Sequence, residues 1–138
     1  MQWYRIVSLI GFVLVISLLW ELIHPLLYVD LTYEPNPLLT PVIDTSFIII
    51  IFLLVYLENK SLDWIDKPQF RDYLTIIGLG FLIALRVEFS AVTMGRWAYA
   101  KFMPVLFGIG LIPLFKLFTT AILALFFIRK INPAILKH

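Results

Sequence analysis

The chain has 138 residues, of which 62% are hydrophobic and 14% charged, and its formal net charge is +2. A soluble domain carries about 25% charged residues, so this composition excludes a water-soluble globule and indicates an all-α polytopic membrane protein that forms a single domain over residues 1–138. Cysteine is absent, which excludes disulfides, thiolate metal sites and cysteine nucleophiles.

The first predicted span covers residues 6–28. Its apolar run begins after Arg5 and lacks, at its end, the small residues that a signal-peptidase site requires. We therefore interpret it as a retained membrane anchor. The prolines, asparagine and acids of residues 30–37 then predict a loop, in which we expect Asp30 and Glu34 to be solvated.

The second span is predicted over residues 40–57, with Pro41 in its first turn, where proline is tolerated. The mixed charges and Trp64 of residues 58–73 predict a connection at the boundary between water and headgroups. The third span follows over residues 73–92.

The third span contains Gly80 and Ala84, a spacing of small residues that lets two helices approach closely. This spacing predicts a helix-packing face. Residues 102–110 are apolar but interrupted by a proline and two glycines, so we expect a short re-entrant or interfacial segment rather than the start of one long kinked helix. The fourth span is then predicted over residues 111–128, which completes a four-helix transmembrane bundle.

Four spans place the N-terminus, the 58–73 connection and the C-terminus on the same side of the membrane. The basic residues on that side are Arg5, Lys60, Lys67, Arg71, Arg129, Lys130 and Lys137, against Arg96 and Lys101 opposite. The positive-inside rule therefore predicts that both termini are cytoplasmic, in a plasma or inner membrane. The aromatic residues near the other boundary are typical of an interfacial belt; they are Trp20, Tyr28, Tyr33, Trp97 and Tyr99.

Ionisable residues inside the spans are the candidates for function, because each costs at least about 2.5–3.5 kcal/mol on insertion scales. They are Glu21, His24, Asp44, Arg86, Glu88 and Lys116. At a rise of about 1.5 Å per residue, the three acids and Lys116 fall within one layer, roughly 6–9 Å below the non-cytoplasmic boundary. The cytoplasmic halves hold no such residue away from their ends, which argues against a transporter with a polar path across the membrane.

Three interpretations of this layer are open. In the first, the acids form a buried ion-pair cluster with Lys116 and Arg86 that fixes helix register. In the second, the ionisable residues line a polar pocket open to the outer leaflet. In the third, Lys116 and Arg86 extend to the headgroups and no site exists. Gly80, Ala84 and Glu88 share one helical stripe. Because Arg86 lies about 200° around the helix from Glu88, we expect it to pair with another helix, a lipid phosphate or a second protomer.

His24 lies three residues after Glu21, so the two could share a proton or a metal ion. This spacing is half of the motif of a di-metal site in helical bundles. Because the second pair is missing, we predict neither a metal nor another cofactor. The sequence also lacks a glycine-rich phosphate loop and the common hydrolase and metalloprotease motifs.

Two patterns resemble known sequences. The first is Glu88 followed by Gly95-Arg96-Trp97-Ala98-Tyr99, Met103-Pro104 and Gly108-Ile109-Gly110-Leu111-x-Pro113-Leu114, and the second is Trp20-Glu21-x-x-His24-Pro25 with Asp44. They look like segments of small uncharacterised four-helix membrane proteins. The resemblance implies the fold but no activity. Those proteins have a polar amide near the position of Lys116, so the resemblance does not extend to this lysine. A looser similarity to sterol-isomerase-type helical bundles rests on architecture alone.

Two functions follow as hypotheses. The first is binding or conversion of a lipid or isoprenoid-like ligand, with Glu21, Asp44, Glu88 and His24 as catalytic candidates. Its ligand-binding candidates are Arg86, Arg96, Lys101 and Lys116. The second is an accessory or assembly subunit of a larger membrane complex, whose charged residues are structural ion pairs. The expected partners are membrane lipids, a lipid-like small molecule, and a homo-oligomer or larger complex. We expect no nucleic acid, because the basic residues lie at the ends of apolar runs.

Overall fold

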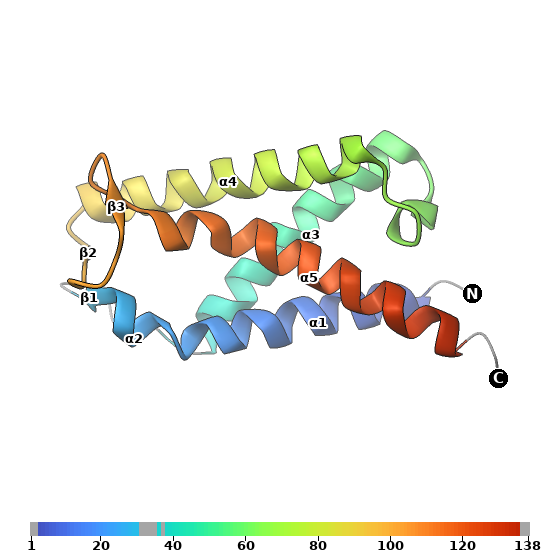
Figure 1. The fold of residues 1–138 in the computed structure, drawn as a ribbon, viewed down its shortest axis with the longest axis horizontal. Coiled ribbons are helices and arrows are strands. Elements are labelled where there is room, and N and C mark those ends of the chain that lie inside the picture. The colour runs from blue at the N-terminus through green and yellow to red at the C-terminus, as the bar shows by residue number, and fades with distance from the viewer. Residues whose placement is uncertain (1–2, 31–35, 37, 136–138) are drawn as a thin grey trace.

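The structure, a computed structural model, describes residues 3–30, 36 and 38–135, which form a bundle of antiparallel helices (Figure 1). The elements are α1 (Trp3–Glu21), α2 (His24–Leu27), β1 (Tyr28–Asp30), α3 (Leu39–Asn59), the 3-10 helix η1 (Leu62–Ile65), α4 (Phe70–Thr93), β2 (Trp97–Tyr99), β3 (Val105–Leu106), β4 (Ile109–Gly110) and α5 (Leu111–Ile135). Within this part of the chain, four helices are long and apolar enough to cross a membrane: α1, α3, α4, and α5 as far as Ile131. Most of the loop predicted over 30–37 lies outside the described residues.

The predicted span over 6–28 is not one continuous helix. α1 ends at Glu21, and the short helix α2 begins at His24 after a turn in which the Ile23 N–H donates to the Trp20 carbonyl. Pro25 has no N–H with which to bond the Glu21 carbonyl, so α1 cannot continue through it. The break turns the chain after Glu21 and sets the direction in which β1 leaves the helix.

The helices pack with α5 against α4 and α1, while α3 packs against α1 and α4 and crosses behind α5 in Figure 1. The predicted packing face of α4 lies against α5: a Cβ at Gly80 would be only 2.8 Å from the Cβ of Phe118. Small side chains at such crossings allow close approach of the helix backbones. The interior between the helices is apolar and includes Val13, Ile48 and Ile76, all fully buried.

One end of the bundle, here called the η1 end, contains the start of α1, the η1 connection and the end of α5 (Figure 1). Asp72 is fully buried there and accepts hydrogen bonds of 2.7 Å from the Gln69 N–H and from Asn59 Nδ2. The carboxylate therefore caps α4 and joins it to the end of α3. The start of α1 and the end of α5 lie beside η1 because the described residues form an even number of long antiparallel helices.

The opposite end, here called the strand end, departs from the all-α prediction. It has two antiparallel two-stranded sheets, β1 with β2 and β3 with β4. Residues 102–110 therefore form a short segment with a tight β-hairpin and are not the start of a long kinked helix, since α5 begins at Leu111. Phe107 and Gly108 both have positive φ, 52° and 78°, as the two central residues of a type I′ turn require.

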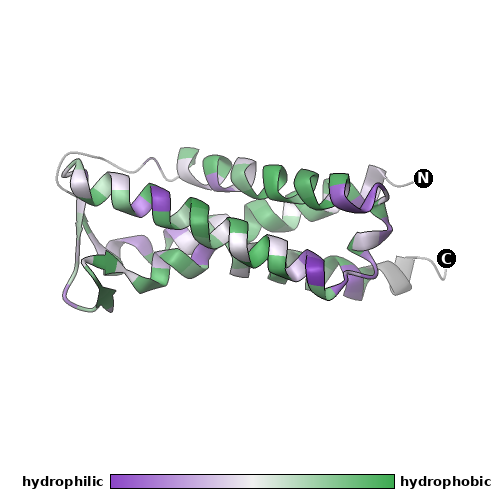
Figure 2. Ribbon diagram, turned by 90° about the horizontal axis from the view of Figure 1, so that it is seen from above, coloured by the Kyte–Doolittle hydropathy of each residue, from purple (hydrophilic) through white to green (hydrophobic). Residues whose placement is uncertain are grey.

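The outer faces of the long helices are apolar. Val15, Ile50, Leu82 and Phe126 are each more than half exposed. In Figure 2 hydrophobic residues predominate along the middle of the helices, and hydrophilic residues lie toward the two ends. An exterior of this kind is unusual for a protein surrounded by water.

Candidate functional site

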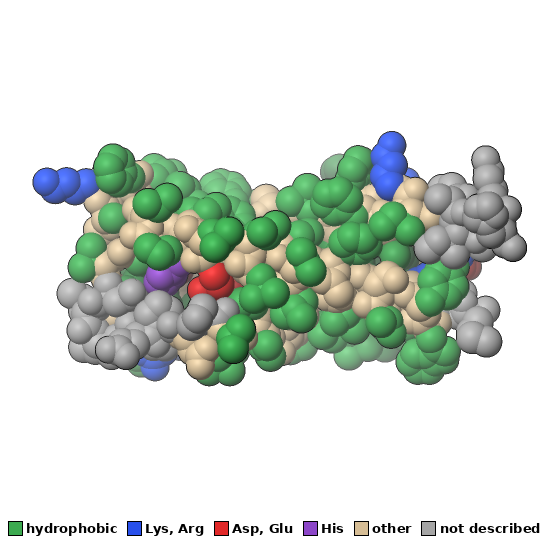
Figure 3. All heavy atoms as spheres, turned by 90° about the horizontal axis from the view of Figure 1, so that it is seen from below, with side chains coloured by type: hydrophobic (Ala, Val, Ile, Leu, Met, Phe, Trp, Pro, Cys, Tyr) green, Lys and Arg blue, Asp and Glu red, His purple; other side chains and the backbone are tan. Residues whose placement is uncertain are grey.

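A cavity of about 370 Å³ lies near the strand end, between α1, α2, α3, α4 and α5. The charged residues and the histidine that line it are Glu21, His24, Asp44, Glu88, Arg96 and Lys116. Figure 3 shows a histidine and an acidic side chain together in a hollow on a long side of the molecule, near this end. Of the site residues predicted from the sequence, only Arg86 and Lys101 are outside the lining.

Lys116 joins three helices at the cavity. Its ammonium nitrogen lies 2.5 Å from Asp44 Oδ2 on α3 and 3.7 Å from Glu21 Oε1 on α1, and all three side chains are largely buried. The contact with Glu21 is an ion pair, but 3.7 Å is too long for a hydrogen bond. The buried cation compensates part of the charge of the two carboxylates. Lys116, Asp44 and Glu21 thus form one part of the predicted ion-pair cluster.

A hydrogen bond between α1 and α5 supports the position of Lys116. Trp20 Nε1 donates to Thr120 Oγ1 over 3.1 Å, and the Thr120 hydroxyl donates to the Lys116 carbonyl over 2.7 Å. Thr120 follows Lys116 by four residues and so lies on the same face of α5. These contacts hold the face of α5 that carries the lysine against the end of α1.

Glu88 is 5% exposed and is surrounded by three aromatic donors, which we call the Glu88 clamp: Tyr28, Trp97 and Tyr99. Tyr28 donates to Oε1 over 2.9 Å, while Tyr99 and Trp97 Nε1 donate to Oε2 over 2.8 and 3.3 Å. Because both carboxylate oxygens accept hydrogen bonds, the arrangement suits an ionised carboxylate, which has no proton to donate.

The β1–β2 pairing explains why the clamp forms. Tyr28 lies directly opposite Tyr99 in the register, so their side chains share one face of the sheet. Trp97 precedes Tyr99 by two residues and therefore points to the same face. His24 stacks on Tyr28 with ring centroids 4.5 Å apart, which places the imidazole beside the clamp.

Both tyrosine hydroxyls are held in the protonated form. Burial raises the pKa of Tyr28, and the negative charge of Glu88 raises it further. Burial also raises the pKa of Tyr99. A hydrogen bond with the Gly110 backbone lowers this pKa in part, and the negative charge of Glu88 raises it further. The two hydroxyls therefore stay hydrogen-bond donors well above neutral pH.

The remaining predicted residues have different positions. Arg86 is exposed, and its guanidinium donates to Ser90 on its own helix. Among the described residues no ion pair joins Arg86 to an acid of the cavity, where Glu21 and Asp44 are paired with Lys116 instead, so Arg86 is not part of that cluster. Its pairing with a lipid phosphate or a second protomer stays a prediction. Arg96 is exposed at the edge of the cavity, and Lys101 is exposed outside it.

Sequence reasoning missed the Glu88 clamp, because Tyr28, Trp97 and Tyr99 were interpreted as members of an interfacial aromatic belt. The spacing of Trp97 and Tyr99 by two residues was an available signal, since it places both side chains on one face of an extended segment. Among the described residues, no three His, Asp or Glu side chains are grouped so as to hold a metal ion.

Comparison with known proteins identified no relative: no protein-family model, curated protein or solved structure matches this chain.

Proposed function

We propose that the protein is an integral membrane protein whose strand-end cavity binds the polar end of a lipid or isoprenoid-like ligand. The observation that supports this most strongly is the convergence of ionisable side chains from four apolar helices on one cavity: Glu21, Asp44, Glu88 and Lys116. Such residues are costly in a membrane and are retained there mainly where they serve a site or pair with one another.

The membrane placement is supported by the length and surface of the helices. α3 has 21 residues, which at about 1.5 Å per residue matches the roughly 30 Å hydrocarbon core. The exposed apolar side chains of the long helices would then face lipid. Basic residues gather at the η1 end, so we propose that this end is cytoplasmic and the strand end is not.

The chemistry of the lining favours a ligand with a hydroxyl group on an apolar body. Hydrocarbon would contact Ile43, Phe47 and Val87, which line the cavity beside the charged groups. The carboxylates accept a hydrogen bond from a hydroxyl, and Lys116 donates one to its oxygen. Because acids outnumber cations inside the cavity, a phosphate there would be repelled, whereas an uncharged alcohol would not. The volume of about 370 Å³ falls within the range of about 300–1,000 Å³ that is usual for small-molecule sites.

Photolabelling tests the proposal. Purified protein in phospholipid vesicles would be irradiated with a diazirine derivative of farnesol, and the labelled peptides would be identified by mass spectrometry. We expect labelling of the cavity-lining part of α3 that includes Ile43 and Phe47, and competition by unlabelled farnesol.

Two tryptophan variants on α4 provide the matched comparison. Val87→Trp fills the cavity and should lower this labelling about tenfold, whereas Leu82→Trp, on the exposed face of the same helix, should leave it unchanged. Labelling that spreads over the exposed helix faces and responds equally to both variants would refute a ligand site here.

The second candidate is an accessory subunit whose polar groups are structural. Its support is that Lys116 is paired with Asp44 and Glu21, and Glu88 is bonded by its clamp, within the chain itself. This candidate predicts no competable labelling. It also predicts that the 16.0 kDa chain, extracted in mild detergent, co-purifies with a larger complex that Val87→Trp leaves intact.

A further inference from the structure

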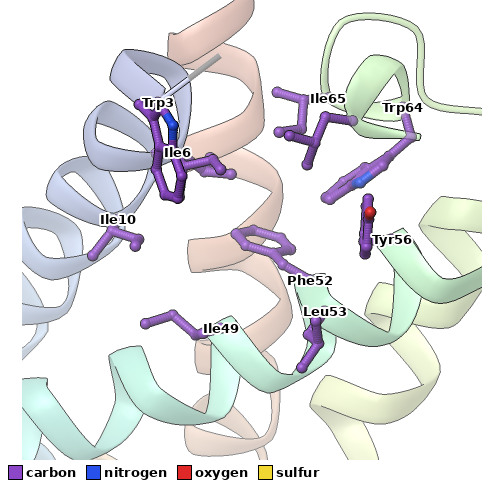
Figure 4. A pocket seen from close by; sticks show the side chains of 11 residues that line it. Trp3, Ile6, Ile10, Ile49, Phe52, Leu53, Tyr56, Trp64 and Ile65 are labelled. Atoms are coloured by element: carbon purple, nitrogen blue, oxygen red, sulfur yellow. The ribbon is translucent and has the colours of Figure 1, made fainter. Parts of the chain in front are cut away.

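A second cavity, of about 620 Å³, lies at the η1 end between α1, α3 and η1 (Figure 4). Its walls are almost entirely apolar side chains, including Ile6 and Ile10 of α1, Phe52 and Leu53 of α3, and Ile65 of η1. None of these residues lines the strand-end cavity. The two cavities are therefore separate.

One polar atom in the wall of this cavity has no partner. Trp64 is 4% exposed, and its indole Nε1 makes no hydrogen bond to any part of the chain that the structure describes. The ring packs against Phe52, with centroids 5.5 Å apart, so it is held in place on that side. A buried N–H donor without an acceptor is unfavourable, and such groups are rare in folded proteins.

The surroundings of Trp64 indicate what would supply the acceptor. In Figure 4 the nitrogen-bearing edge of the Trp64 ring is turned to the side of the cavity where Tyr56 lies. Lys60 is exposed and directly follows the end of α3, four residues after Tyr56, and Arg5, on α1, is paired with Asp66. An apolar cavity with a buried donor in its wall and an exposed lysine nearby has the features that the glycerol and headgroup region of a phospholipid would match.

We infer that the apolar cavity holds one acyl chain of a diacyl phospholipid, with an ester carbonyl oxygen accepting the hydrogen bond from Trp64 Nε1. The acyl chain contacts the apolar walls, and the phosphate lies near Lys60. This inference rests on the membrane placement proposed above but is independent of the ligand at the strand-end cavity.

Lipid retention tests the inference. Delipidated protein would be reconstituted with diacyl phosphatidylglycerol or with its dialkyl ether analogue, which lacks the carbonyl oxygens, and the lipids retained after extraction in mild detergent would be counted by native mass spectrometry. We expect wild-type protein to retain one diacyl lipid, and to retain the ether analogue about five- to tenfold less, as the loss of one hydrogen bond implies.

Two variants separate the hydrogen bond from general effects on the fold. Trp64→Phe should retain both lipids at the same low level. Trp3→Phe, which changes an exposed tryptophan of the same cavity, should behave as wild type. Ile49→Trp, which fills the cavity from α3, should also lose the lipid if Trp64→Phe does not fold.

The outcomes distinguish this inference from the proposed function. Equal retention of the diacyl lipid by wild type and by Trp64→Phe, or no preference for the diacyl over the ether lipid, would overturn it. Failure of the wild-type protein to float with vesicles would overturn the membrane placement itself. Flotation without a retained lipid would overturn only the acyl-chain site.

Discussion

The ammonium of Lys116 on α5 lies 2.5 Å from the carboxylate of Asp44 on α3, although the two residues are more than half the chain apart in sequence. The same ammonium lies 3.7 Å from Oε1 of Glu21 on α1. One lysine thus compensates two carboxylates from different helices. Its removal would leave both acids side by side in a largely buried position.

We therefore predict that Lys116→Met lowers the free energy of unfolding by about 2–4 kcal/mol, because uncompensated buried carboxylates repel one another and lose their counter-ion. Adding Asp44→Asn to this variant should restore part of the loss. Unfolding in detergent micelles, followed by circular dichroism, measures both effects. Arg86→Met, which removes an exposed cation of α4, is the control, with an expected change within about 0.5 kcal/mol. Equal losses in the two single variants would contradict the role given to Lys116.

The Glu88 clamp predicts a loss of stability in alkali. The pKa values of Tyr28 and Tyr99 lie above their ordinary value of 10.0 in the folded protein, so the folded state holds these protons more tightly than the unfolded state. Their contribution is complete below about pH 10 and is lost as the pH rises toward the folded-state pKa values. The thermal stability of wild type should therefore fall more steeply above pH 10 than that of the Tyr28→Phe/Tyr99→Phe double variant.

Tyr56→Phe, which changes an exposed tyrosine outside the clamp, should keep the steep alkaline fall of wild type. At neutral pH the double variant should be less stable than wild type, by about 1.5–3 kcal/mol for each hydrogen bond to a charged group. The same alkaline slope in wild type and the double variant would show that the clamp does not govern this behaviour.

The α4–α5 crossing predicts opposite effects at two glycines of one helix. A Cβ at Gly80 would be 2.8 Å from Phe118 Cβ, whereas a Cβ at Gly78 would meet nothing within 4 Å. Gly80→Ala should lower the free energy of unfolding by about 1–3 kcal/mol through overpacking. Gly78→Ala should be neutral or raise it by up to about 1 kcal/mol, because alanine has the better helix propensity. Thermal unfolding in detergent measures the difference, and equal behaviour would argue against this crossing.

The absence of cysteine allows the proposed orientation to be measured without background. Lys67→Cys lies at the η1 end and Lys101→Cys at the strand end, and both positions are exposed. A membrane-impermeant maleimide applied to intact cells should label Lys101→Cys at once and Lys67→Cys only after permeabilisation. The reverse pattern would invert the orientation, and labelling of both in intact cells would refute the membrane placement.

The long helices could be predicted from the sequence because each is a nearly uninterrupted apolar run, bounded by charged residues, proline or glycine. The break after Glu21 could not be placed in the same way, since residues 22–28 are still mostly apolar and Pro25 is the residue that indicates a change. The hairpin at Phe107 and Gly108 was missed for a related reason: its strands are two residues each, too short for an alternating pattern to be recognised.

Much of the candidate site could also be predicted, because depth along a helix follows directly from residue number. Glu21, Asp44, Glu88 and Lys116 were placed in one layer in this way, and all four line one cavity. Which acid pairs with Lys116 could not be predicted, since the rotation of each helix depends on packing with its neighbours. The aromatic donors of Glu88 come from strands whose pairing joins residues 28–30 to 97–99, a contact between distant segments that no local pattern reveals.

Gly110 brings the backbone of the β3–β4 hairpin close to the ring of Tyr99. A Cβ at this position would lie 2.7 Å from Tyr99 Cε1, so the hairpin backbone packs closely against this ring. The hydroxyl of the same ring donates a hydrogen bond to Glu88 over 2.8 Å. The hairpin tip, Phe107, is 96% exposed. The shape of the hairpin is therefore tied to the position of the Tyr99 ring, and through its hydroxyl to Glu88 in the wall of the cavity.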